Sequence, residues 1–223
     1  AEEQREQSAL RNPAPGALSD VIRQPHRLWE RRPSDEDFLV VRLGVGTGDL
    51  ACGVTVRPAG DPMLVPEPIS QAHLDRMLKR CSTIDDLPIA VPLHGTVSLI
   101  GPHDVTANAI RALLLQVAVL HAPDDLRLHL ALPLSGGEDT GRWALWLPHI
   151  LDDHRFDGPI GLRGASTDED SAEALISELD ERREEMTAKG KTRLLQVERP
   201  HLIVVVDMES DHGRFVMSKL AEV

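Results

Sequence analysis

A run of apolar β-formers near the end of the chain constrains the fold more than any other feature. Residues 201–208 read HLIVVVDM, so both faces of the expected strand are apolar. Such a strand is typical of a parallel sheet that helices cover on both sides. Apolar segments at 97–100 (VSLI) and 126–132 (LRLHLAL) predict two more strands, and the spacing of apolar residues over 104–120 predicts a helix between them. This alternation of strands and helices predicts a three-layer α/β fold.

The rest of the chain is less regular. The segments FLVVRLGVG and LACGVTV predict a β-hairpin over 38–56, with Thr47, Gly48 and Asp49 as its turn. Ser70 is a candidate N-cap for a helix over 71–81. Two further elements are expected: a short apolar helix or turn at 141–150 and a charged amphipathic helix at 171–189.

Charge and composition narrow the classes of function. The 223 residues carry a formal net charge of −12, which disfavours a general grip on nucleic acid. No run of about 18 apolar residues is present, and the polar, acidic N-terminus does not resemble a signal peptide. The two cysteines, Cys52 and Cys81, have no metal-binding or redox spacing and are typical of a reducing compartment.

The segment LIGPHDVTANAIRALLLQ, residues 99–116, has the order of a phosphate-binding loop: buried strand, short loop, helix N-terminus. A working loop reads G-x-x-x-x-G-K-[ST]. With its first glycine at Gly101, the last three positions hold Thr106, Ala107 and Asn108. Ala107 has no charge for the phosphates, and Asn108 replaces the hydroxyl that binds Mg²⁺. The candidate nucleotide-binding residues are Gly101, Pro102, His103, Asp104, Val105, Thr106, Ala107 and Asn108.

The end of the 201–208 strand supplies the partner of such a loop. Asp207 follows four apolar β-formers, as does the aspartate that lies beside Mg²⁺ in P-loop ATPases. Met208 stands where an active ATPase often has glutamate, and Glu209 is one position further on. Asp207 and Glu209 are therefore candidate catalytic residues, and Asp207 with Asn108 could hold Mg²⁺ if a nucleotide binds. A strand that ends in aspartate is also common in any parallel α/β domain.

Other conspicuous residues have simpler interpretations. The scattered histidines lack metal-ligand spacing. Trp143 and Trp146 favour core or inter-domain packing over ligand stacking. A group of three arginines beside Trp29 could lie near anionic headgroups or be solvated, and both alternatives stay open; they are Arg27, Arg31 and Arg32.

Several longer stretches carry a family resemblance over residues 28–210. Three stretches resemble the FtsK/SpoIIIE class of motor ATPases. They are the turn HAPDDLRL at 121–128, the segment with Trp143, Trp146, Pro148 and His149, and the lead-in Arg199-Pro200 before Asp207. The segment LWERRPSDEDFLVVRLGVG at 28–46 resembles the opening of the first cytoplasmic domain in EccC ATPases of type VII secretion.

This resemblance implies a fold, a place and a set of partners. The expected fold is a three-layer P-loop NTPase-like (RecA/FtsK-like) parallel sheet with an N-terminal β-hairpin appendage. Residues 1–27 would be a stalk or linker after transmembrane helices, and 28–223 a degenerate ATPase domain whose α/β core spans 97–208. The domain would lie at the cytoplasmic face of the plasma membrane. Its partners would be other domains of the same ATPase, membrane components of the channel and, by self-association in a ring, further copies; no nucleic acid is expected.

The expected function is structural coupling between the channel and downstream ATPase domains, without catalysis or with weak catalysis. The alternative is a slow but genuine ATPase that uses Asp207 and Mg-ATP, with a missing basic residue supplied from elsewhere. A DNA translocase is a third alternative, which the net charge of −12 and the segment at 28–46 disfavour.

Overall fold

The computed structural model describes residues 1–24, 26–56, 67–132, 141–157, 160–165, 169–189 and 199–221. The α-helices are α1 (Glu2–Arg11), α2 (Leu18–Arg23), α3 (Pro68–Cys81), α4 (His103–Leu120), α5 (Glu169–Lys189) and α6 (Asp211–Leu220), and the short 3₁₀ turns are η1 (Pro15–Ala17), η2 (Gly141–Trp146) and η3 (Pro148–Ile150). The strands are β1 (Val40–Asp49), β2 (Thr83–Pro92), β3 (Leu126–Ala131), β4 (Leu151–Asp157), β5 (Ile160–Arg163) and β6 (His201–Val206). No helix among these residues is long and apolar enough to cross a bilayer.

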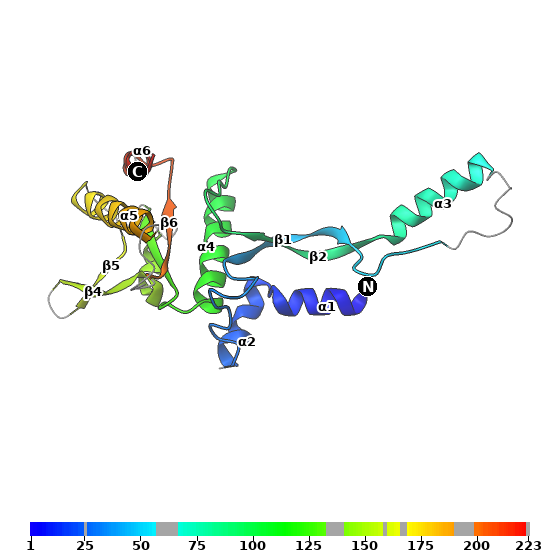
Figure 1. Cartoon of the computed structure of the whole chain (residues 1–223), viewed down its shortest axis with the longest axis horizontal. Coiled ribbons are helices and arrows are strands. Elements are labelled where there is room, and N and C mark those ends of the chain that lie inside the picture. The colour runs from blue at the N-terminus through cyan, green and yellow to red at the C-terminus, as the bar shows by residue number, and fades with distance from the viewer. Residues whose placement is uncertain are drawn as a thin grey trace.

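The parallel pair β3–β6 forms the centre of the α/β part, with helices on both sides (Figure 1). The two strands run in register from Leu126 opposite His201 to Ala131 opposite Val206. Side chains of β6 alternate between the two sides. Leu202, Val204 and Val206 pack toward α5 and α6, while Ile203 and Val205 join the core that contains Leu114 and Val117 of α4. The predicted α/β class and its parallel strands are therefore confirmed.

Two predicted strand features are wrong. Residues 97–100 form no strand, and the side chain of Ile100 is 96% exposed. A short apolar run does not by itself fix a strand, since it needs an edge to pair with. Both edges of β3 are taken, one by β6 and the other by Gly164 and Ala165.

The second strand feature that was predicted wrongly is the hairpin over 38–56. Thr47, Gly48 and Asp49 continue β1, which pairs antiparallel with the distant β2 to form a long ribbon. The register shifts near Gly44 and Gly48, so irregular pairing and not a turn accounts for these glycines.

Most predicted helices are present, with different ends. The expected helices at 71–81, 104–120 and 171–189 correspond to α3, α4 and α5, and the 141–150 segment forms η2 and η3. The cap of α3 is Glu67, whose carboxylate accepts from the backbone N–H groups of Ile69 and Ser70, so Ser70 is not the cap. Strands β4 and β5 were not predicted.

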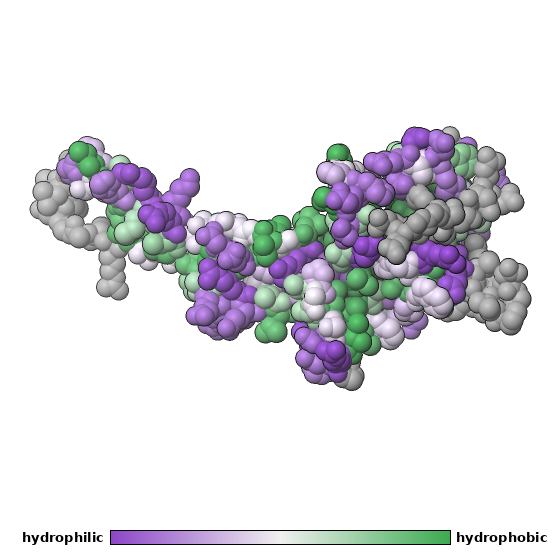
Figure 2. Space-filling model, turned by 180° about the vertical axis from the view of Figure 1, so that it is seen from behind, coloured by the Kyte–Doolittle hydropathy of each residue, from purple (hydrophilic) through white to green (hydrophobic). Residues whose placement is uncertain are grey.

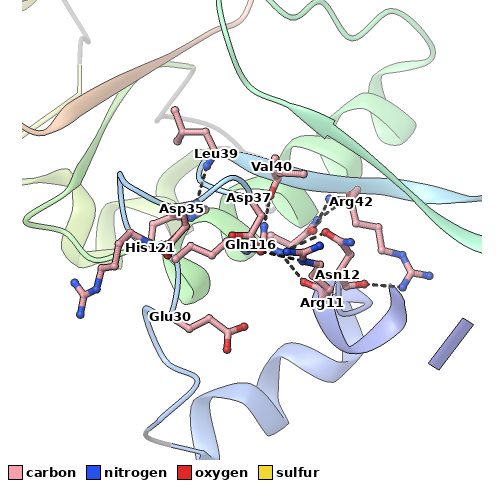
Figure 3. A network of polar contacts seen from close by, with 12 residues as sticks. Arg11, Asn12, Glu30, Asp35, Asp37, Leu39, Val40, Arg42, Gln116 and His121 are labelled. Atoms are coloured by element: carbon pink, nitrogen blue, oxygen red, sulfur yellow. Dashed lines mark hydrogen bonds and ion pairs between the residues drawn. The ribbon is translucent and has the colours of Figure 1, made fainter. Parts of the chain in front are cut away.

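A buried arginine joins the N-terminal segments, and Figure 3 labels the residues Arg11, Asn12, Asp37 and Val40 that contact it. The side chain of Arg31 is 2% exposed, and its guanidinium donates to the carbonyl oxygens of Val40 and Arg11 and, at 3.3 Å, to Asn12 Oδ1. Its Nε lies 3.6 Å from Asp37 Oδ2. Burial lowers the pKa of Arg31, and the carboxylate of Asp37 opposes this shift. The end of α1 and the start of β1 therefore meet at one charge, and Arg31 is not among the solvated or headgroup-facing arginines considered above.

Gln116 of α4 and His121, the residue that follows this helix, bind the backbone around the start of β1. The amide of Gln116 accepts from Arg42 N at 2.9 Å and donates to Arg42 O at 3.0 Å, as a neighbouring strand would. His121 Nε2 accepts from Leu39 N at 3.0 Å. Since the backbone N–H can only donate, the ring is neutral with its proton on Nδ1, which lies 3.0 Å from the carbonyl oxygen of Val117.

We predict that Arg31→Met lowers the free energy of unfolding by about 3 kcal/mol, because it leaves buried carbonyl groups and Asp37 without their cationic partner. The control is Arg23→Met, whose ion pair with Asp20 is exposed and should contribute at most about 1 kcal/mol. Urea unfolding of both variants measures the difference, and equal losses would contradict the role assigned to Arg31.

Buried neutral histidines make stability depend on pH. Burial lowers the pKa of both His121 and His129 to about 4 and also lowers that of His149. Each imidazole binds a proton more readily in the unfolded chain, where its pKa is about 6.5. Their contribution is therefore complete above pH 6.5 and is lost as the pH falls below it, down to about 4 for His121 and His129.

We predict that lowering the pH from 7.5 to 5 reduces the free energy of unfolding by about 2 kcal/mol for His121 alone. The measurement is the urea midpoint against pH, with exposed His94→Asn as the control that keeps the same profile. His121→Asn should be less stable at pH 7.5 and should flatten the profile; an unchanged slope in this variant would refute the assignment.

Candidate functional site

The candidate residues come from two segments that meet at one edge of the α/β part. The N-terminus of α4 and the carboxyl end of β6 lie at the same edge (Figure 1), and His103 Nδ1 lies 3.8 Å from Glu209 Oε2. Both side chains are largely exposed. Ligands of α/β sheets generally bind where parallel strands end and helices begin, so this is the edge at which a phosphate group would be sought.

The predicted phosphate loop is mostly helical. Gly101 and Pro102 precede α4, and residues 103–108 form its first turns. An added Cβ at Gly101 would meet only Thr106 Cγ2 at an ordinary 3.7 Å, so the backbone does not require glycine there. A phosphate-binding loop needs several backbone N–H groups pointing into one concavity. Here the N–H groups of Val105 and Thr106 donate to the carbonyl oxygen of Pro102 instead.

Side chains of this segment are also engaged within their own helix. Thr106 Oγ1 lies 3.2 Å from the carbonyl oxygen of Pro102 and 3.0 Å from that of His103. Asn108 Oδ1 accepts from Arg111 Nη1 at 2.7 Å. The oxygen predicted to bind Mg²⁺ therefore already has a cationic partner.

Asp207 organises the turn from β6 into α6. Its Oδ1 accepts from Glu209 N at 3.0 Å, and its carbonyl oxygen accepts from Ser210 Oγ at 2.8 Å. Ser210 caps α6 by accepting from Gly213 N at 2.9 Å. A Cβ on Gly213 would lie 1.8 Å from the carbonyl oxygen of Asp207, so only glycine fits where the helix crosses the strand end.

The charges at this edge are mixed. The carboxylates of Glu209 and Asp211 follow the strand end and Asp104 lies in the first turn of α4, whereas Arg214 is committed to the carbonyl oxygens of Met208 and Glu209 and to Asp211. The sequence has no lysine between Lys79 and Lys189. Among the described residues no group of three or more His, Cys, Asp or Glu side chains could hold a metal ion.

The motifs of the family resemblance lie in the interior more than at this edge. His121, Leu126 and Leu128 of the HAPDDLRL turn are buried, and Asp125 pairs with Arg32 at 3.2 Å. Arg199 pairs with Glu185 of α5 at 2.7 Å. These contacts hold the turn and the lead-in to β6 in place, which is a role in architecture and not in nucleotide binding.

The two tryptophans have separate environments. Trp143 packs against the main core, with the guanidinium of Arg111 5.8 Å from its ring centre. Trp146 is 82% exposed and lies 5.8 Å from the guanidinium of Arg163. The packing prediction thus fits Trp143, while Trp146 is available for contact with another molecule.

Sequence reasoning missed the buried polar residues Arg31, Gln116, His121 and His149. His149 Nε2 lies 2.8 Å from the carbonyl oxygen of His121, which links η3 to the end of α4. The only available signal was a polar residue amid apolar ones, as at Gln116 within LLLQVAVL. Such a signal indicates burial of a polar group but does not name its partner.

Comparisons with known proteins identify relatives of one kind. The chain is 38% identical over 159 residues, 70% of its length, to the ESX secretion system protein EccC of Thermomonospora curvata. It is 32% and 29% identical, over 93% of its length, to the ESX-3 protein EccC3 and the ESX-5 protein EccC5 of Mycobacterium tuberculosis. The chain spans only 12–15% of these relatives. No protein-family model matches it.

We predict that Gly213→Ala lowers the free energy of unfolding by about 1–3 kcal/mol, since α6 must shift away from the end of β6. Gly16→Ala is the matched control, because a Cβ there meets no atom within 4 Å. Thermal unfolding of the two variants tests this, and an unchanged midpoint for Gly213→Ala would show that the close approach is not present in solution.

Proposed function

Because the chain belongs to the EccC family of ESX secretion system proteins, we propose that it is the membrane-proximal, ATPase-like module of such a protein and couples the secretion channel to downstream ATPase domains. Residues 1–27 would lead from transmembrane helices, and 28–223 would be a degenerate FtsK/SpoIIIE-like domain at the cytoplasmic face of the plasma membrane. Its partners would be the other domains of the same ATPase and the channel components.

One observation carries the coupling role: helix α4 connects two distinct regions. In its C-terminal half Gln116 bonds to Arg42 of β1, and the carbonyl oxygen of Leu120 accepts from Arg31 N at 2.9 Å. His121, which directly follows the helix, accepts from Leu39 N. Its N-terminus carries the segment 101–108 and meets Glu209. At 18 residues the helix is about 27 Å long. Under this proposal, a displacement at one end of the helix would be transmitted to the other.

The state of the candidate site supports a scaffold over a catalyst. The first turns of α4 are hydrogen-bonded internally, Asp207 caps a turn, and the sequence has no lysine between Lys79 and Lys189, the stretch that contains the 101–108 segment. A P-loop-like ancestry would account for a parallel pair β3–β6 with helices on both sides and no working phosphate loop. The proposed fold and domain division therefore describe a domain with an ATPase-like fold whose role is to contact other proteins.

A slow ATPase is the second candidate, and the meeting of His103 with Glu209 favours it. It would use Asp207 to hold Mg²⁺ and would take a basic group from a neighbouring domain or copy. Asp207 has one carboxylate oxygen beyond the Oδ1 that Glu209 N engages. Such an oxygen suits a hard divalent cation.

We predict that Mg-ATP at millimolar concentration moves the melting temperature of the chain by less than about 1 °C. Ligand at about a hundred times its dissociation constant would add roughly 2.7 kcal/mol and raise the midpoint by several degrees. Phosphate release measured on the same samples reports hydrolysis. The variants are Asp207→Ala and, as an exposed control, Asp124→Ala.

A rise in melting temperature with Mg-ATP that is absent in Asp207→Ala and present in Asp124→Ala would contradict the scaffold proposal and support the slow ATPase. In the whole protein, Asp207→Asn should leave secretion of substrates intact under the scaffold proposal. Loss of secretion in a stably folded Asp207→Asn variant would contradict that proposal independently of the melting data.

A further inference from the structure

Helix α3 projects from the molecule on the β1–β2 ribbon (Figure 1). Its principal contact among the described residues is with the start of β2, and none of its side chains is buried. Ile69 and Met77 are 68% and 54% exposed. Figure 2 shows that this arm, defined here as α3 with the adjoining end of the ribbon, stands clear of the body and carries both polar and apolar residues. Packing against the described part of the chain therefore gives this helix little stabilisation.

The charge of α3 is opposite to that of the whole chain. Arg76, Lys79 and Arg80 outweigh Asp75, which gives the helix a net charge of +2 in a chain of −12. The three cationic side chains are exposed. Their spacing of three and four residues places Arg76 with Lys79 and Arg80 along one side of the helix.

A complementary face lies on α5, at the other end of the molecule (Figure 1). Helix α5 contains eight acidic and three basic residues, for a net charge of −5. Glu173, Ser177, Asp180 and Glu184 recur at helical spacing and are all exposed. Ala174 and the half-buried Ile176 flank this acidic face and offer apolar surface beside it.

We propose that copies of this chain associate head to tail, with the basic arm of one copy against the acidic face of α5 on the next. The two surfaces lie at opposite ends, so one copy cannot bring its own surfaces together. Complementary charge favours the encounter, and Met77 and Ile69 would gain apolar contact beside it. Because the contact joins different surfaces, it repeats from copy to copy. It depends on neither nucleotide nor the coupling role.

The test is sedimentation velocity of the 223-residue chain, whose monomer mass is 24.5 kDa, over a concentration series. At low salt we expect the mean mass to rise with concentration, and at about 0.5 M salt to return to that of the monomer, because exposed charges are screened. Arg76→Glu with Lys79→Glu, or Asp180→Lys with Glu184→Lys, should each weaken the association at least tenfold, since like charges would face each other.

Mixing the two variants provides the sharpest readout. The reversed arm of one matches the reversed face of the other, so the mixture should regain the mass that neither shows alone. Arg23→Glu with Arg142→Glu changes the net charge as much as the arm variant does and lies outside both surfaces, so it should leave the association unchanged. A rescued mixture with an unaffected control supports the interface.

Three results would overturn the proposal. They are a monomeric mass at low salt over the whole concentration series, an equal effect of the Arg23 and Arg142 control, and a failure of the mixture to associate while both variants melt as the parent does. If the chain stays monomeric and instead sediments with anionic phospholipid vesicles through Arg76 and Lys79, the arm binds a lipid surface and not a second copy.

Discussion

The N-terminal half of the molecule depends on the burial of one positive charge. The guanidinium of Arg31 is out of water, and removing it from solvent costs more than any single hydrogen bond returns. It is tolerated because Val40, Arg11 and Asn12 supply oxygen atoms and Asp37 supplies the opposite charge. These groups come from different segments, so the charge is satisfied only when all of them have reached their final positions. Burial of the charge thus selects one arrangement of the end of α1, the loop that carries Arg31 and Asp37, and the start of β1.

The same region shows how a helix can substitute for a strand. The first residues of β1 would expose an unpaired backbone on the side away from β2. Gln116 of α4 bonds to Arg42 there, and His121, which follows the helix, accepts from Leu39 N just before the strand, so side chains cover this edge. The antiparallel ribbon and the parallel pair are therefore held by one helix, although the two sheets share no hydrogen-bonded strand. This arrangement explains why polar residues are conspicuous in the otherwise apolar end of α4.

Periodicity was sufficient to predict the elements with strong local signals. The helix at α4 and the strands β3 and β6 follow from apolar spacing, and their α/β order follows from the apolar character of both faces of β6. The hairpin failed because Thr47-Gly48-Asp49 has the composition of a turn, whereas the true partner β2 is distant in sequence. Pairing over such a distance leaves no local trace. At the candidate site, composition placed Asp207 at a strand end but could not show that its carboxylate caps the following turn.

The separation of β3 from β6 also affects how the chain reaches this structure. Residues 132–200 must be synthesised before β6 can pair with β3. During synthesis from the N-terminus, α4 and β3 emerge first and present apolar surface and an unpaired strand edge until residue 206 is available. Closing so long a segment is slow compared with forming local helices. The nascent chain therefore has a period of exposure to aggregation, which ends when β6 docks.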